Sequence, residues 1–460
     1  MRALIVLLTV AALAEAAVFG FRARATIAEW WHAPAGDGVQ YYSLASNLVA
    51  HHVLAYGDLR PTWTRPPLYP LFLARVVDRT LQPLEEHLVR ATRWNARLDV
   101  CTALLVWLIA WRRRVVVAGW LALVGVLACP LLILLSTYAL SESLATLLTT
   151  AVILFAVLAL EGAAVRWAIA AGLVGGALML IRADGVTVIP PVVLALWLAR
   201  ASRRRRLTAI VAFGVAWAAA IAPWGIRNVR LFGEPHLLGA KWLAKDGTPM
   251  RTGPEEWMWT WERHASAGLM NLRMLSRTHL DLTLMPAEVI HDDQERRAVE
   301  HALDDCNAAG VSADVAREFR ALSVERRRRY PFEVYVKTPL GRMKDLWMDT
   351  IQEGDMPLGV APFGLGERAL FTRFDHRLYL LALAGLLLAL IPGAGRRHAK
   401  LAAIIALAAL TRTAVDGATQ AHVTQRYLVE IYPLVILLAA MAPALAAERA
   451  LALGRRLRGR

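Results

Sequence analysis

The sequence predicts a mainly α-helical, polytopic membrane bundle of about ten spans, joined to an outer domain that is also mostly helical. Two observations lead to this prediction. The 460-residue chain is 57% hydrophobic, and its apolar residues are gathered in runs of near-spanning length, which a soluble protein of this size does not need. Short basic clusters separate many of these runs, as the positive-inside rule predicts for cytoplasmic loops.

The first apolar run, residues 3–21, is long enough for a retained anchor, although small residues near Ala14 would also allow a cleaved signal peptide. We prefer the anchor. The further spans are expected near residues 88–111, 115–137, 143–160, 166–181, 186–199, 207–224, 377–392, 400–415 and 428–446. With the N-terminus inside, span parity and charge asymmetry agree on which side is cytoplasmic.

These spans divide the chain into three parts. Residues 1–226 form the first part of the bundle and include an outer loop at 22–87. Residues 227–376 are mostly polar and are expected to form an outer, extracytoplasmic domain. Residues 377–460 hold the last three spans and a basic cytoplasmic tail.

The outer domain is expected to contain two main helices. One covers Glu288–Ala309 and stops at Gly310, and the other is capped by Ser312 and runs to about Arg329. The segment after it, Tyr330–Trp347, alternates aromatic and basic residues and is expected to lie on the bilayer surface.

Three tryptophans of the outer domain, Trp257, Trp259 and Trp261, could stack on a sugar ring. Interfacial anchoring or local packing is the favoured interpretation.

Composition argues against two other classes of protein. The net charge of +15 could suggest nucleic acid, but the basic residues lie between apolar segments, so we expect no nucleic-acid partner. Cys101 and Cys129 lie in apolar segments and Cys306 is alone in a polar loop. The cysteines therefore predict no disulfide framework and no metal-ligand spacing.

The stretch from Gly36 to Pro70 has the residues of a site rather than those of a linker. Asp37 and Tyr41 are four apart and share one face of a predicted amphipathic surface helix. The stretch ends in Arg65-Pro66-Pro67-Leu68-Tyr69-Pro70, whose prolines are expected to hold the backbone extended.

The unusual ionisable residues all fall at the outer ends of predicted spans, where a charge is costly unless it is paired or used. These residues are Asp37, Arg65, Glu142, Arg182, Asp184, Arg227 and Arg426. Each also has a structural explanation. Asp37 or Glu142 could cap a helix, Arg182 could pair with Asp184, and the other arginines could reach lipid headgroups. Their shared side favours a common outer site.

Carboxylates beside arginines suit transfer of a sugar from a lipid phosphate. The leaving phosphate is stabilised by arginine and needs no acid, whereas the acceptor hydroxyl needs a base. One carboxylate is enough for direct displacement at the anomeric carbon, and inversion follows. Glu142 would position the acceptor or help hold a divalent cation.

Six short motifs together resemble the membrane glycosyltransferases of the C-fold (GT-C) superfamily, in the branch similar to protein O-mannosyltransferases and lipid A aminoarabinose transferases. The likeness covers nearly the whole length. The motifs are Gly36-Asp37 with Tyr41, Arg65–Pro70, Ser141-Glu142, Arg182-Ala183-Asp184, Pro223-Trp224 with Arg227-Asn228, and Gln425-Arg426-Tyr427. Each motif is weak alone, and their order and common side make the set specific.

The resemblance implies an enzyme of the cell inner or plasma membrane with an extracytoplasmic active site. Asp37 would be the catalytic acidic residue and a polyprenyl-phosphate sugar the donor, with a sugar, lipid or protein hydroxyl as acceptor. It implies donor or lipid-phosphate binding by Arg65, Arg182, Arg227 and Arg426, with Tyr41, Tyr69, Asp184 and Tyr427 in support.

Many members carry two adjacent acidic residues at the first site. Here Gly36 and Gly38 flank a lone Asp37, so a divalent cation, Mg²⁺ or Mn²⁺, is left open as a cofactor.

Two other functions remain as alternatives. A transporter or lipid-carrier flippase would place ionisable groups near mid-membrane on broken helices, often in inverted repeats, and the sequence shows no such symmetry. A scaffold subunit of an envelope assembly would not need Asp37. The sequence leaves the sugar, the acceptor, the prenyl chain length and the oligomeric state open.

Overall fold

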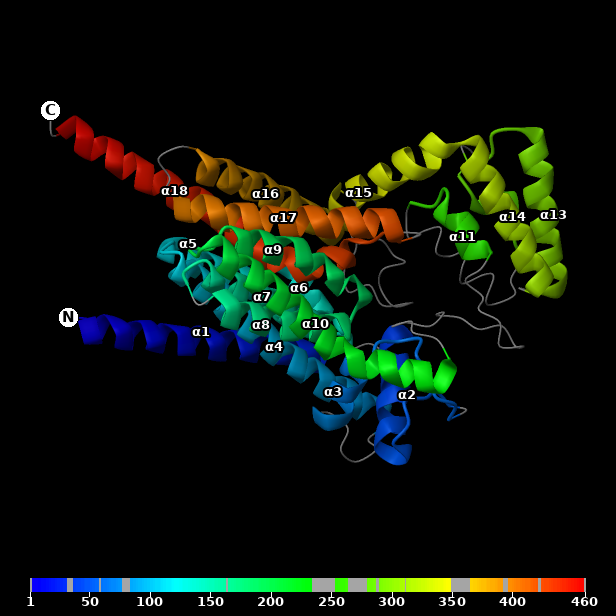
Figure 1. The fold of residues 1–460 in the computed structure, drawn as a ribbon, viewed down its shortest axis with the longest axis horizontal. Helices are drawn as coiled ribbons and strands as arrows, with labels where there is room; N and C mark the ends of the chain where they lie inside the picture. Colours follow the sequence, from blue (N-terminus) through cyan, green and yellow to red (C-terminus); the bar gives the residue numbers. More distant parts are fainter. Residues whose placement is uncertain are drawn as a thin grey trace. The chain divides into compact units, whose positions relative to one another are not determined.

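The computed structural model describes residues 2–30, 36–57, 59–76, 83–162, 164–233, 253–263, 279–286, 289–310, 312–348, 365–391, 396–420 and 423–458 (Figure 1). Within these residues every regular element is a helix, and the only strand-like pairing is a single bridge between Ala55 and Pro61. The chain forms two compact units. The first contains Met1–Leu237, Leu365–Arg412 and Val429–Arg460, and the second contains Leu238–Gly364 and Thr413–Leu428.

The first unit is a bundle of long apolar helices. Its helices are α1 Arg2–Trp30, α2 Gly36–His51, α3 Leu68–Val76, α4 Leu84–Arg112, α5 Val116–Ala128, α6 Pro130–Ser136, α7 Glu142–Ala159, α8 Ala164–Met179, η1 Ala183–Val188, α9 Ile189–Trp197, α10 Arg203–Phe232, α16 Leu365–Leu390 and α18 Tyr432–Arg458. Helix α17, Arg396–Thr419, and the 3₁₀ segment η6, Gln425–Ile431, each contribute residues to both units.

Each of the ten predicted spans is helical in the part of the chain that the structure describes. Five helical stretches there are long and apolar enough to cross a membrane, namely Val6–Thr26, Glu142–Ala159, Arg203–Phe232, His398–Thr419 and Gln425–Arg455. Helices α5 and α6 would make a sixth if they are one span. The prediction of a polytopic helical membrane protein is confirmed. The count of ten spans is not confirmed, because α8 and the stretch Ala183–Trp197 are shorter than the five candidate spans and several other segments carry charges.

Three local predictions are corrected by the structure, and each concerns a proline. The expected single span at residues 115–137 is two helices that meet at Pro130 with a bend of 47°. Pro70 does not extend the chain. It lies in the first turn of α3, where its missing N–H costs no hydrogen bond. Helix α10 passes through Pro223 and ends at Gly233, which has a φ of 73°, so Arg227 lies on a helix rather than after one.

Helices α8 and α10 pack closely because small residues line their contact. A Cβ on Gly172 would lie 2.4 Å from the carbonyl oxygen of Phe213, and one on Gly176 would lie 2.5 Å from the Cβ of Ala220. Glycine therefore lets the two backbones approach, as small residues do between membrane helices. This packing brings the C-terminal end of α8, which leads to Arg182, against α10.

The second unit is a smaller helical domain. Its elements are α11 Pro254–Trp259, η2 Leu282–Leu284, α13 Asp293–Ala309, α14 Ala313–Arg329, the single π-helical turn η4 Glu333–Lys337 and α15 Thr338–Met348. Helices α13 and α14 pack side by side (Figure 1). The expected stop at Gly310 and the cap at Ser312 are both present. The first of these helices starts later than expected, because Asp292 caps it at Asp293.

Trp257 and Trp261 belong to the buried core of the second unit, with exposed fractions of 0% and 6%. The ring of Trp257 lies 5.3 Å from that of Phe319. Local packing is therefore the correct interpretation for these two tryptophans. Trp259 instead donates a hydrogen bond from its indole to the carbonyl of Ala418 at 3.0 Å.

Candidate functional site

Asp37 lies in the first turn of α2 and forms an ion pair with Arg65. The same guanidinium donates two hydrogen bonds to the amide oxygen of Gln40, at 2.8 and 3.2 Å. The Asp37 side chain is 27% exposed and that of Arg65 is 12% exposed. The carboxylate is thus held in one orientation while part of it stays accessible, as a general base requires.

Two buried tyrosines, Tyr41 and Tyr69, pack next to this ion pair. Arg65 lies 5.3 Å from the centroid of the Tyr41 ring, and that ring meets Tyr69 edge-on at 4.7 Å. Burial opposes the charge of Arg65, but Tyr41 and the Asp37 carboxylate outweigh it and raise the pKa of the guanidinium above its ordinary value. Burial also raises the pKa of Tyr41 and that of Tyr69. Both phenols therefore stay neutral at physiological pH.

The first turn of α2 packs against the segment that precedes α7. A Cβ on Gly38 would lie 3.3 Å from the carbonyl oxygen of Ala139, and Tyr41 hydrogen-bonds the side chain of Ser141. The turn after Arg65 is anchored as well, because the Leu68 amide donates to the Leu180 carbonyl at 2.9 Å. The structure therefore brings the expected motifs around Asp37, Arg65 and Glu142 into one region of the first unit.

A buried network of five charged side chains begins at Glu142. Arg182 contacts Glu142 at 3.2 Å, Asp184 at 2.9 Å and Glu430 at 2.8 Å. Arg412, on α17, bridges Asp184 at 2.8 Å and Glu430 at 2.5 Å. We call these five residues the buried network. Arg182 is the most exposed of them, at 14% of its side chain.

The buried network satisfies its two guanidiniums with three carboxylates. Charges inside an apolar bundle are tolerated when each has an opposite partner in good geometry, and here each arginine faces at least two carboxylates. The expected pairing of Arg182 with Asp184 is found. Arg182 is engaged on three sides, which differs from the availability expected of a lipid-phosphate ligand.

Arg227 lies on α10 and reaches the loop that leads to Arg65. Its Nη1 donates to the Thr62 carbonyl at 3.0 Å and to the Asn228 side chain at 2.9 Å. Its guanidinium also lies 4.5 Å from the centroid of the Trp224 ring. Arg227 therefore helps to hold the loop that carries Arg65 in place. The Arg227 side chain is only half-buried, so part of it remains accessible.

Arg426 and Tyr427 belong to the second unit, on η6, and both are half-buried. The Tyr427 amide donates to the Thr424 carbonyl at 3.0 Å. Their part in donor binding stays a prediction.

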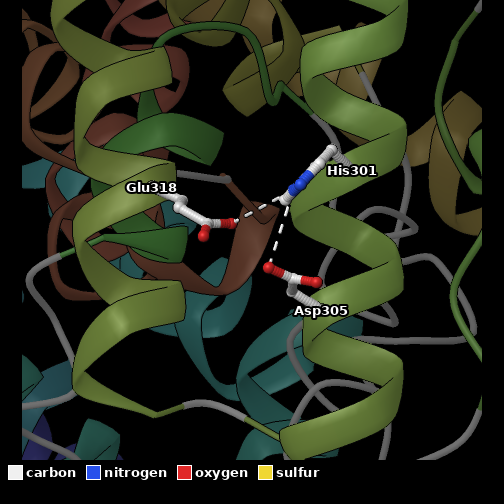
Figure 2. Close-up of side chains that lie close together, drawn as sticks. All are labelled: His301, Asp305 and Glu318. Carbon is white, nitrogen blue, oxygen red and sulfur yellow. Dashed lines mark ion pairs between the residues drawn. The ribbon is translucent and has the colours of Figure 1, made fainter.

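Among the described residues, one group offers three metal-ligand atoms that all lie within 4.8 Å of one another (Figure 2). It consists of His301 and Asp305, one turn apart on α13, and Glu318 on α14. The imidazole Nδ1 lies 3.6 Å from Asp305 and 3.8 Å from Glu318. His301 is exposed at the surface of the second unit, and it pairs there with the half-buried Asp305 and Glu318. Around Asp37 the described residues form no such group.

Sequence reasoning missed Arg412 and Glu430, which complete the buried network, and Gln40, which fixes Arg65. A signal was present for the first two. Both are charged residues inside or beside long apolar runs, where a charge implies a partner. Nothing in the local sequence could indicate the partner, because Arg412 and Asp184 are 228 residues apart.

No protein-family model and no curated protein matches the sequence. Solved structures do match. The apo oligosaccharyltransferase of Archaeoglobus fulgidus matches with a TM-score of 0.50 and 15% identity over 96% of this chain and 52% of its own. AglB of the same organism, in complex with an inhibitory peptide and a dolichol-phosphate, matches with a TM-score of 0.50 and 14% identity over 96% and 51%.

A third structure, ArnT from Cupriavidus metallidurans bound to undecaprenyl phosphate, matches with a TM-score of 0.40 and 13% identity over 96% and 78%. The chain spans about half the length of the two archaeal oligosaccharyltransferase chains. Their likeness extends over nearly all of this chain, and it confirms the expected resemblance at the level of the fold. The chain has the fold of the C-fold membrane glycosyltransferases.

Proposed function

We propose that this protein is an integral membrane glycosyltransferase that moves a sugar from a polyprenyl-phosphate donor to an acceptor hydroxyl of the cell envelope. The observation that carries the proposal is the Asp37–Arg65 pair. In this pair the partly accessible carboxylate of Asp37, in the first turn of α2, is held in one orientation by the guanidinium of Arg65. The fold supports the lipid donor, because the structure of AglB, which has the same fold, is a complex with an inhibitory peptide and a dolichol-phosphate.

The chemistry is a single displacement. The acceptor oxygen attacks the anomeric carbon, the bond from that carbon to the phosphate oxygen breaks, and polyprenyl phosphate leaves with the bonding electrons. The proton of the acceptor hydroxyl passes to the Asp37 carboxylate. Configuration at the anomeric carbon inverts because only one displacement takes place.

Arg65 and Arg227 are the arginines best placed to hold the donor phosphate. Arg65 lies in the loop before α3, and Arg227 donates a hydrogen bond to the Thr62 carbonyl of the same loop. Neither guanidinium is held between several carboxylates as that of Arg182 is. A phosphate that binds Arg65 would compete with Asp37 for the guanidinium, so donor binding would release the carboxylate for the acceptor hydroxyl. Arg182 then supports Glu142, for which the proposal keeps the role of positioning the acceptor, and Arg426 remains a candidate donor ligand.

No step of this mechanism passes through a metal ion. Asp37 is a lone carboxylate that already faces Arg65, and the carboxylates of the buried network face Arg182 and Arg412. These residues do not make a cation site by themselves. Dependence on Mg²⁺ or Mn²⁺ is tested directly by assaying transfer with and without a chelator.

We expect the active site to face the extracytoplasmic side of the inner or plasma membrane. The alternative remains a transporter or lipid-carrier flippase. It predicts movement of the lipid-linked sugar with no covalent change in it, so the two functions differ in the mass of the products.

The test is to incubate purified protein with a panel of polyprenyl-phosphate sugars and acceptors and to follow donor and product by mass spectrometry. Asp37→Asn should lower the transfer rate by ~10²–10⁴-fold, the usual contribution of a general base. Glu86→Gln is the matched control, because this exposed carboxylate pairs with Arg90 one turn away. Transfer by Asp37→Asn at the wild-type rate would refute the assignment of the base.

A further inference from the structure

The end of α14 and the segment that follows it expose an unusual number of large apolar side chains. Phe332 is 68% exposed, Tyr335 55% and Leu340 58%, and Val336 between them is 38% exposed. Single exposed apolar residues are ordinary on a protein surface, but a contiguous group marks a contact site. We call these four residues the apolar face.

The spacing of the apolar face is that of one side of a helix. Its members stand at positions i, i+3, i+4 and i+8 from Phe332, across η4 and the first turn of α15. The opposite side of the same segment holds Val334 and Leu346, both with an exposed fraction of 0%. The segment is therefore anchored in the second unit by one side while the other side faces outward.

Exposed basic residues flank the apolar face. Between Arg326 and Lys344 the chain carries five arginines and two lysines against one acidic residue, Glu333, and of the arginines Arg326 and Arg342 are buried. Arg328, Lys337 and Lys344 are exposed. An apolar stripe flanked by lysine and arginine is the pattern of a helix that lies in the interface of an anionic bilayer.

The second unit is also tethered by its chain to the unit that contains the candidate membrane spans. Its main segment, Leu238–Gly364, is joined to the first unit at both ends, after α10 at one end and before α16 at the other. Such tethering raises the effective concentration of the apolar face at the membrane without any further contact. The flanking basic residues and the tethering therefore both favour a lipid bilayer as the surface that covers the apolar face.

We infer that the apolar face, together with its flanking basic residues, docks the second unit onto the headgroup region of an anionic lipid bilayer. Phe332, Tyr335 and Leu340 enter the interface, and Arg328 and Lys344 contact lipid phosphates. The docking does not depend on sugar transfer. It would restrain the unit at the depth where a lipid-borne substrate carries its headgroup.

The inference is tested with the full chain in vesicles. Cys101, Cys129 and Cys306 are replaced by alanine, and Tyr335→Cys carries an environment-sensitive fluorophore. The vesicles contain phosphatidylcholine and phosphatidylglycerol with nitroxide-labelled lipids as quenchers. We expect strong quenching at position 335, and weaker quenching when phosphatidylglycerol is left out or salt is raised.

The matched control is Glu300→Cys, an exposed position on α13 outside the apolar face, which should show little quenching. The double variant Phe332→Ser with Leu340→Ser should reduce quenching at position 335 several-fold, while far-UV circular dichroism stays unchanged. A label at 335 that is as solvent-exposed as the label at 300 would overturn the inference. So would a shielded label that lipid nitroxides do not quench, because that result places a protein surface on the face.

Discussion

The two units of this protein stabilise their buried charges in different ways. In the first unit each deeply buried arginine faces carboxylates. Arg412 bridges two of them, and Arg24 lies 3.6 Å from Asp99 while donating to the Val126 carbonyl. The second unit also buries an ion pair, Arg326 with Glu295 on the neighbouring helix, but its buried Arg342 donates to the backbone carbonyls of Glu262, at 2.7 Å, and Trp259, at 2.5 Å.

The difference follows from what surrounds each unit. Helices of a membrane bundle have lipid outside and satisfy most of their own backbone groups, so a buried charge there is compensated mainly by another side chain. The second unit has an apolar core that includes Trp257, Trp261 and Phe319, and the residues at the end of α11 leave carbonyl groups available as acceptors. The first unit therefore joins helices far apart in the chain by charge compensation, whereas the second combines ion pairs such as Arg326–Glu295 with apolar packing and helix caps.

The largest effect on stability should come from breaking the buried network. Arg412→Met keeps most of the side-chain volume but leaves Asp184 and Glu430 without one of their cations. Removal of one partner from a buried ion pair costs about 3–5 kcal/mol, so we expect a large fall in the apparent Tm of the protein in detergent. Thermal unfolding followed by intrinsic fluorescence measures it.

Two further variants show whether charge causes that fall. Adding Asp184→Asn to Arg412→Met should recover part of the lost Tm, because one uncompensated carboxylate is removed, and the double-mutant cycle gives the coupling energy. Arg90→Met, which breaks the exposed pair with Glu86, should change Tm little, since surface pairs contribute ~0.2–1 kcal/mol. Equal losses for Arg412→Met and Arg90→Met would contradict the dependence of the first unit on its buried charge compensation.

The second unit manages a buried acid by keeping it neutral, and this predicts a pH dependence. Burial raises the pKa of Glu262 to about 8, and the positive charge of Arg342 opposes the rise only in part. The folded state then holds a proton that the unfolded chain releases near its ordinary pKa of 4.5. The contribution to stability is full below pH 4.5 and is lost as pH rises to 8, with a slope of up to ~1.4 kcal/mol per pH unit.

Glu262→Gln should flatten this part of the profile when Tm is measured between pH 5 and 8, because the amide carries no titrating proton. Glu300→Gln, at an exposed position on α13, is the control and should leave the slope as it is in the wild type. A wild-type Tm that rises steadily over this range would show that Glu262 is ionised in the folded unit.

The sequence-based predictions succeeded where the cause of a feature lies nearby in the chain and were less reliable elsewhere. Local signals were sufficient where the cause is local, as for the cap at Ser312, the stop at Gly310 and the helical nature of each apolar run. They were misleading at Pro70 and Pro223, because a proline near a helix start costs no hydrogen bond and a packed helix tolerates one inside. The fold class rests on hydrophobic runs, which are strong local signals.

The site was predictable in its residue types and only partly in its contacts. The sequence indicates Asp37, Arg65, Glu142 and Arg182 because charges at the ends of apolar runs imply partners. It could not show that Arg65 binds Asp37, or that Arg412 closes the network from α17. Those contacts depend on how helices far apart in the chain pack together, and a single sequence holds no record of that packing.

The smallest effect should come from a helix cap, and it sharpens the comparison because the units differ here too. In the first unit α10 has a long cap bond from Arg205 N–H to Ser202 Oγ, at 3.4 Å, and the described N-termini of α4, α5, α6, α7 and α9 have no side-chain cap, whereas in the second unit Ser312 Oγ accepts the Val315 N–H at 3.2 Å. Ser312→Ala should cost ~1 kcal/mol, seen as faster amide exchange in the first turns of α14. Ser312→Asp retains an acceptor and favours the positive helix end, so it should exchange as slowly as the wild type. If alanine and aspartate gave the same rates, the cap would contribute nothing, and apolar packing alone would hold α14 in place.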